Sequence, residues 1–271
     1  MSQKLQTTPS SILIITRQKS FVNYLYPFFG KNFPRNHLLT SGKCAILITL
    51  YNKYYALKGK NMYDFYIFDL DGTLLNTLND LASSVNATLT HFGYPTRTTK
   101  EVCAFIGNGI KLLVLRSLGC EPENFSEILQ FFKDYYSKHS TEQTKPYDGV
   151  LELLRRLKSQ GKKLAIVSNK SDFATKALSK EFFNGLIDIA LGENEENGIS
   201  KKPAPDSIEL ALKQADISKE RAVYIGDSDV DIQTAKNAGI PCISVTWGFR
   251  DEAFLRANGG ACFAHSPIEI E

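Results

Sequence analysis

Short apolar runs alternate with longer helical stretches from residue 62 to the end of the chain. This alternation is typical of a parallel sheet covered by helices, because parallel strands need a long crossover between them. It predicts an α/β fold with a doubly wound, Rossmann-like sheet as its core. The predicted strands are Tyr63–Phe68, Leu164–Val167, Leu186–Ala190, Ala222–Ile225, Pro241–Val245 and a weaker one near Ala261–Phe263. The predicted core helices are Val150–Gln160, Asp172–Lys180, Asp206–Ala215 and Asp231–Ala238.

An insertion of about 70 residues separates the first two predicted strands. Apolar residues recur in it at helical spacing, for example at Leu81, Val85 and Leu89. A strand–helix–strand crossover needs only about 30 residues. We therefore expect residues 78–145 to form a small helical cap domain, and residues 62–77 and 146–271 to form the α/β core.

Residues 1–61 differ from the rest in charge. They carry nine Lys or Arg and no Asp or Glu, so that residues 62–271 have a net charge of −6 in a chain whose total is +3. Their apolar runs are far shorter than the roughly 20 residues of a membrane-spanning helix. Phe, Ile, Lys, Asn and Tyr, which have A/T-rich codons, fill 26 of these positions, and Met62 directly precedes the first predicted strand. We expect that this basic extension is not part of the catalytic protein; a targeting segment and an ordinary extension are the alternatives.

Polar residues follow the ends of the predicted strands. The first strand leads into Asp69-Leu70-Asp71-Gly72-Thr73 and the second into Ser168-Asn169. Lys201-Lys202-Pro203 precedes the fourth strand, and Gly226-Asp227-Ser228-Asp229-Val230-Asp231 follows it. The carboxyl ends of parallel strands meet at one edge of a sheet, where open α/β folds bind ligands. The order therefore predicts a site of carboxylates, a hydroxyl, an amide and a lysine at that edge.

The motifs DLDGTL, SN, KP and GDSDVD, taken in this order, resemble those of the haloacid dehalogenase superfamily of phosphohydrolases. The resemblance covers nearly all of the chain from Met62 onward and implies hydrolysis through an aspartyl-phosphate. Asp69 would be the nucleophile, and Asp71 would be the general acid for the leaving group and then the base for water. Ser168 and Asn169 would donate hydrogen bonds to the phosphoryl oxygens, and Lys202 would neutralise their charge.

The resemblance also implies a Mg²⁺ cofactor, because a cation is needed between an anionic nucleophile and an anionic phosphate. The carboxylates of Asp69 and Asp227 and the backbone carbonyl of Asp71 would be its protein ligands. Asp231 and Ser228 would lie behind these ligands, where Asp231 would orient a metal-bound water or the lysine of the KP motif.

The helical insertion resembles the cap of phosphoglycolate phosphatases and β-phosphoglucomutases. Within it, Gly107, Asn108 and Gly109 are the candidates for a substrate-facing loop, because a predicted helix over Ile110–Leu118 starts there and a helix N-terminus favours an anion. A plain helix–helix turn is the alternative. Thr73 in the first motif is a further candidate for substrate contact.

Two basic residues flank the motifs. Arg250 could meet a substrate carboxylate or form a surface salt bridge, and Lys170 is predicted to be a solvated charge beside the site. The GDS, SNK and Trp247-Gly248-Phe249-Arg250 segments most resemble phosphoglycolate phosphatases. This implies a small phosphorylated metabolite, such as 2-phosphoglycolate, as the substrate.

Three alternatives stay open at this point. They are a phosphosugar mutase similar to β-phosphoglucomutase, a pyrophosphatase or nucleotidase of the same superfamily, and a phosphorylatable signalling module. The sequence contains no GxxxxGK[ST], HExxH or GxSxG motif, which argues against other hydrolase chemistries. Five widely spaced cysteines without a CxxC pair favour a reducing, cytoplasmic location. We expect neither nucleic acid nor membrane as a partner, and a monomer or homodimer.

Overall fold

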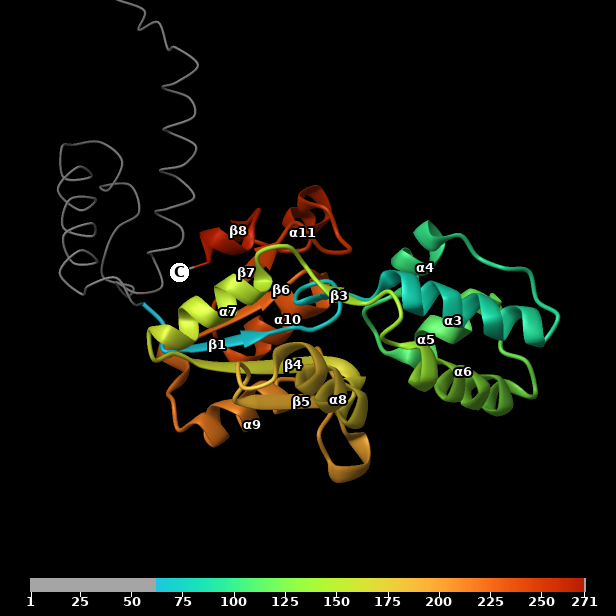
Figure 1. Ribbon diagram of the computed structural model, residues 1–271, viewed down its shortest axis with the longest axis horizontal. Helices are drawn as coiled ribbons and strands as arrows, with labels where there is room; N and C mark the ends of the chain where they lie inside the picture. The colour runs from blue at the N-terminus through green and yellow to red at the C-terminus, as the bar shows by residue number, and fades with distance from the viewer. Residues whose placement is uncertain (1–61, 271) are drawn as a thin grey trace, which may run out of the picture. The chain divides into compact units, whose positions relative to one another are not determined.

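The core is a six-stranded parallel sheet with the strand order β5-β4-β1-β6-β7-β8 (Figure 1). The computed structural model describes residues 62–270, so the predictions for residues 1–61 lie outside the described residues. The predicted α/β class and the parallel sheet are confirmed. The strands are β1 (Phe65–Phe68), β4 (Lys163–Ser171), β5 (Ile189–Glu193), β6 (Ala222–Gly226), β7 (Cys242–Val245) and β8 (Cys262–Ala264).

Helices cover both faces of this sheet because successive strand side chains point to opposite sides. In β1, Tyr66 and Phe68 belong to the hydrophobic cluster that includes α7 and α8. Phe65 and Ile67 belong to the opposite cluster, which includes α9 and α10. The helices are α7 (Val150–Ser159), α8 (Asp172–Phe183), α9 (Asp206–Ala215), α10 (Asp229–Ala238) and the short α11 (Glu252–Ala257), with 3-10 turns at Glu195–Asn197, Lys219–Arg221 and Pro267–Glu269.

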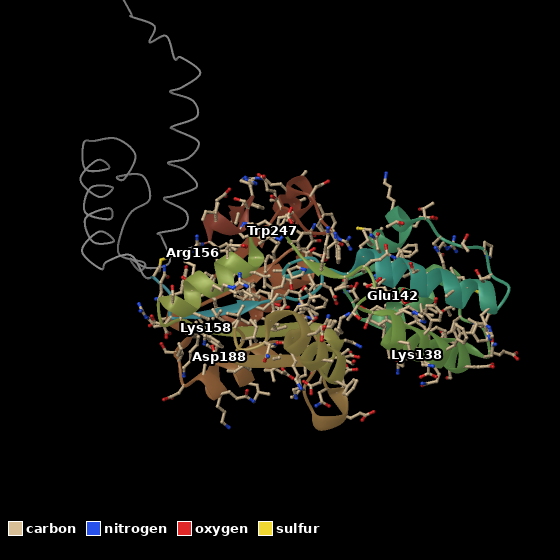
Figure 2. All side chains as sticks on the ribbon, in the orientation of Figure 1. Lys138, Glu142, Arg156, Lys158, Asp188 and Trp247 are labelled. Atoms are coloured by element: carbon tan, nitrogen blue, oxygen red, sulfur yellow. The ribbon has the colours of Figure 1, made fainter. Side chains whose placement is uncertain are left out.

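Two strands, β4 and β5, differ most from the sequence prediction. β4 continues through Ser171, so Ser168 and Asn169 lie inside the strand rather than after it. β5 begins at Ile189 instead of Leu186, because Asp188 ends the preceding loop. Its backbone N–H donates to the Leu164 carbonyl, and its side chain accepts a hydrogen bond from the Leu164 N–H at 2.8 Å. The same carboxylate lies 2.6 Å from Lys158 of α7, and Figure 2 labels both residues.

Four helices lie beyond the end of the sheet to which β1 points, and we call them the cap (Figure 1). They share a hydrophobic core of their own that includes Leu81, Val85, Leu89, Ile128 and Phe132. The helices are α3 (Leu78–His91), α4 (Thr99–Phe105), α5 (Ile110–Leu118) and α6 (Phe125–His139). None of the helices between residues 62 and 270 is long and apolar enough to cross a membrane.

Two short strands connect the cap to the core. They are β2 (Leu75–Asn76) and β3 (Lys145–Pro146), which pair in antiparallel fashion. Beside them the buried carboxylate of Asp80 accepts hydrogen bonds from the backbone N–H groups of Gln143 and Thr144, at 2.9 and 2.8 Å. The returning segment is thereby fixed to the first turn of α3.

Candidate active site

The first motif forms a tight turn directly after β1. Asp69 is buried there, and the backbone N–H groups of Thr73, Leu74 and Leu75 all donate to the Leu70 carbonyl. Gly72 sits in this turn with a φ of +90°, and a Cβ at that position would collide with the carboxylate of Asp227. Only glycine suits such a close approach at positive φ. The turn therefore brings the first and fourth motifs into contact.

Lys202 joins the nucleophile candidate to the start of α10. Its Nζ donates to Asp69 Oδ1 and to Asp231 Oδ1, both at 2.7 Å, and to the Tyr224 hydroxyl at 3.1 Å. Burial opposes the charge of this ammonium, but the carboxylates of Asp231 and Asp69 outweigh it and hold the pKa of Lys202 above its ordinary value. The lysine is thus a charged group at the closed end of the site.

The carboxylates of this site are crowded and buried. Burial raises the pKa of Asp69 to about 7 although Lys202 opposes the shift, and the neighbouring Asp231 and Asp71 carboxylates add to it. Burial, followed by Asp231 and Asp69, also raises the pKa of Asp227 well above its usual range. Negative charges held this close together in a buried site call for a cation.

A divalent cation fits these residues. Asp69, Asp227 and Asp231 each offer a carboxylate oxygen, and the three oxygens lie within 4.8 Å of one another. Carboxylate oxygens are the ligands that Mg²⁺ prefers. Both oxygens of Asp231 already accept hydrogen bonds, from Lys202 and from the hydroxyl and N–H of Ser228. Asp69 and Asp227 also line the cleft, whereas Asp231 does not. Asp69 and Asp227 are therefore the better ligands, and Asp231 is the residue that holds the lysine.

A cleft opens between this cluster and the cap. Its core side includes Asp69, Asp71, Ser168, Lys202 and Asp227. Its cap side is mostly apolar and consists of Leu81, Ile106, Gly107, Gly109, Ile110 and Leu113. The arrangement combines a floor of carboxylates and a lysine with a mostly apolar wall on the cap side.

Comparison with known proteins agrees with this geometry. Residues 66–245 match the model of the haloacid dehalogenase-like hydrolase family. The chain belongs to this family. A phosphoglycolate phosphatase of Pseudomonas savastanoi pv. phaseolicola is 33% identical over 196 residues, which cover 68% of this chain and 69% of that protein. A phosphoglycolate phosphatase of Aquifex aeolicus is 33% identical, and the match covers 84% of that protein. The chain is also similar to a protein of Lactobacillus delbrueckii subsp. bulgaricus whose crystal structure is known. The two structures superpose with a TM-score of 0.73 at 36% sequence identity, and the match covers 77% of this chain and 97% of that one.

In this haloacid dehalogenase-like hydrolase, two predicted substrate contacts have other partners. Thr73 is buried outside the cleft lining and donates to Asp227 Oδ1 at 3.4 Å. Asn108 does not line the cleft either, and its side chain accepts a hydrogen bond from Arg116 of the cap. The glycines on both sides of Asn108 do line it. Their roles toward a substrate stay predictions.

The two predicted site residues in β4, Ser168 and Asn169, differ in their contacts. Ser168 lines the cleft, and its hydroxyl accepts only the N–H of Lys170 among the described residues. The Asn169 amide is occupied on both sides: it donates to the carbonyls of Gly107 and Lys202 and accepts from the Lys202 N–H at 2.7 Å. Asn169 therefore fixes the backbone of the lysine and the cap loop, whereas the sequence predicted a donor to phosphate.

The prediction for Lys170 is wrong, whereas that for Arg250 is refined. Lys170 is not solvated; its side chain is 3% exposed and lies 3.0 Å from Asp71 Oδ2. Arg250 lines the cleft and donates to the carbonyls of Cys103, Ala104 and Ile106 at the end of α4. It forms no salt bridge among residues 62–270, and its contact with a substrate carboxylate stays a prediction. Tyr136 of α6 accepts a hydrogen bond from Lys170 Nζ at 2.9 Å, and its place in the cap sequence, far from every motif, gave no signal of this contact.

Proposed function

We propose that this chain is a Mg²⁺-dependent phosphomonoester hydrolase that acts on a small phosphorylated metabolite, such as 2-phosphoglycolate. The proposal depends above all on one contact, the 2.7 Å approach of the Lys202 ammonium to the Asp69 carboxylate at the base of the cleft. A nucleophile and a cation held side by side suit the transfer of an anionic phosphoryl group. The identity to proteins named phosphoglycolate phosphatase supports the same conclusion.

In the first step, an Asp69 oxygen attacks the phosphorus and the bond to the alcohol oxygen breaks. Asp71 gives its proton to that leaving oxygen, so the alcohol departs neutral. In the second step, a water molecule attacks the phosphorus and loses its proton to Asp71. The aspartyl-phosphate bond then breaks and restores the Asp69 carboxylate. Lys202 and the Ser168 hydroxyl face the phosphoryl oxygens in both steps.

Asp69, Asp227 and the backbone carbonyl of Asp71 would hold Mg²⁺. When bound, this cation neutralises charge between the carboxylates and the phosphate. Asp231 keeps the ammonium of Lys202 directed at Asp69, since it accepts from the same Nζ. Phe249 fixes the Asp227 carboxylate through its backbone N–H at 2.7 Å.

The cap side of the cleft favours a small substrate. The apolar residues Leu81, Ile106, Ile110 and Leu113 offer no partners for a row of sugar hydroxyls. The loop of Gly107 and Gly109 leads into the N-terminus of α5, where a substrate carboxylate is favoured. The cysteines of residues 62–270 are all free, which is consistent with a reducing compartment such as the cytoplasm.

A phosphate-release screen tests this proposal. The full chain is incubated with Mg²⁺ and with 2-phosphoglycolate, β-glucose 1-phosphate, pyrophosphate, a nucleoside monophosphate and 4-nitrophenyl phosphate. We expect release from 2-phosphoglycolate with the highest kcat/KM. Conversion of β-glucose 1-phosphate into an isomer without free phosphate would instead identify a mutase. A stable phosphoprotein without released alcohol would identify a signalling module.

A further inference from the structure

Lys170 is buried beside Asp71 and has no role in the reaction as described so far. We propose that Lys170 is a positioning residue that orients Asp71 for proton transfer, and that Tyr136 of the cap holds Lys170 in place. The inference rests on the proposed function, because it assigns to Asp71 the proton transfers of a phosphomonoester hydrolase.

The backbone of Lys170 is fixed by hydrogen bonds to β4 and to α8. Its backbone N–H donates to the Ser168 hydroxyl at 3.3 Å, and its carbonyl accepts from the Thr175 hydroxyl at 3.3 Å. The side chain then reaches the cleft, which it lines, with its Nζ 3.0 Å from Asp71 Oδ2. Because β4 pairs directly with β1, which leads into the turn of Asp71, this contact sets the direction of the Asp71 carboxylate.

The two oxygens of Asp71 have different surroundings. Oδ2 is held by Lys170, whereas Oδ1 is buried and has no hydrogen-bond partner among residues 62–270. A buried carboxylate oxygen without a partner is unusual, and such atoms gather where chemistry occurs. The geometry assigns the moving proton to Oδ1, with Oδ2 as the fixed end of the group.

Tyr136 extends this arrangement into the cap. Its hydroxyl accepts a hydrogen bond from Lys170 Nζ at 2.9 Å, and its ring centroid lies 4.8 Å from the same atom. Tyr136 belongs to α6 and is 6% exposed. The ammonium is therefore enclosed by a carboxylate of the core and an aromatic ring of the cap. When the cap is seated as in this structure, the position of the acid depends on a cap side chain.

A series of substituted phenyl phosphates tests the proposal, because proton donation matters most for poor leaving groups. The measured quantity is kcat/KM, which reports on the steps up to release of the phenol. For Lys170→Met we expect a loss of about 100-fold on phenyl phosphate and under about fivefold on 4-nitrophenyl phosphate. Tyr136→Phe, which removes one oxygen and keeps the ring, should show the same trend with a loss of about tenfold. Lys170→Arg should restore part of the phenyl phosphate activity.

Two matched controls accompany these variants. Lys176→Met removes an exposed lysine of α8, and Tyr135→Phe removes a hydroxyl from the neighbouring residue of α6; neither should change the ratio between the two substrates. In the Asp71→Asn background, Lys170→Met should not lower kcat/KM further for either substrate, since both residues serve the same proton transfer. Circular dichroism melting of each variant shows whether it is folded.

Each result decides the proposal. Equal losses on good and poor leaving groups, in either Lys170→Met or the milder Tyr136→Phe, would show a merely structural role and overturn it. A further loss in the Asp71→Asn background would overturn it as well. If the wild-type chain hydrolyses none of the esters, the proposed function itself fails, and this inference fails with it.

Discussion

Lys202 Nζ lies 2.7 Å from Asp69 Oδ1, although the two residues are 133 positions apart in the sequence. The contact joins the end of the central strand to the loop before α9, inside a site that is almost closed to solvent. It places a permanent positive charge beside the carboxylate that we propose as nucleophile.

Asp69→Asn should abolish turnover of 4-nitrophenyl phosphate, because an amide cannot form the aspartyl-phosphate. We expect a loss of at least about 1,000-fold in kcat. The fold should persist, as the substitution keeps the size of the side chain. Asp229→Asn, at the start of α10 and outside the cleft lining, is the matched control and should stay within twofold of wild type, roughly. Retained turnover in Asp69→Asn would refute the mechanism.

Lys202→Met should lower both activity and stability. Its removal leaves Asp69 and Asp231 without their shared cation, and breaking a buried ion pair costs about 3–5 kcal/mol. Urea unfolding would measure this change in the free energy of unfolding. Lys201→Met removes the adjacent, partly exposed lysine, whose contacts are with Glu193 and Glu195 at 3.4 Å or more. This control should change stability by less than about 1 kcal/mol. Equal effects of the two variants would contradict the assignment to Lys202.

Mg²⁺ should stabilise the protein more at pH 8 than at pH 5.5. The pKa of Asp69 is raised to about 7, and that of Asp227 is also raised well above its ordinary value. Between the ordinary carboxyl pKa and these values the folded chain binds more protons than the unfolded one, so the metal-free stability falls as pH rises. Mg²⁺ competes with these protons and binds better once they are lost.

Thermal unfolding with and without Mg²⁺ at both pH values measures this effect. The increase in Tm caused by Mg²⁺ should be larger at pH 8 in the wild-type chain. In Asp227→Asn it should be much reduced at both pH values. An equal increase at both pH values in the wild type would show that the metal does not bind these carboxylates.

Asp80→Ala should destabilise the junction between cap and core. The Asp80 carboxylate accepts the N–H groups of Gln143 and Thr144 in a buried position. Leaving these donors without a partner costs about 1–3 kcal/mol each, so the free energy of unfolding should fall by about 2–6 kcal/mol. Asp134→Ala on the exposed side of α6 serves as the control. A loss no greater than in that control would show that the junction is held by other contacts.

Much of the fold was predictable because the local sequence patterns agree with the helices and strands that the chain forms. The helix over Asp206–Ala215 has the predicted boundaries, and each predicted core strand overlaps an observed one. The boundaries that failed depend on contacts between elements. The start of β5, for example, is displaced by the hydrogen bonds of Asp188 to Leu164 on the neighbouring strand.

The sequence by itself determined the α/β class, the helical insertion and the meeting of four motifs at one sheet edge, because periodicity and strand order decide these features. The burial of Lys170 and the partners of Asn169 and Arg250 were decided only by the tertiary structure. Lys170 reads as a surface charge in its own strand, and it becomes an interior cation only when α6 brings Tyr136 against it. A side chain's solvent exposure and partners belong to the packing of distant segments, and no local pattern contains them.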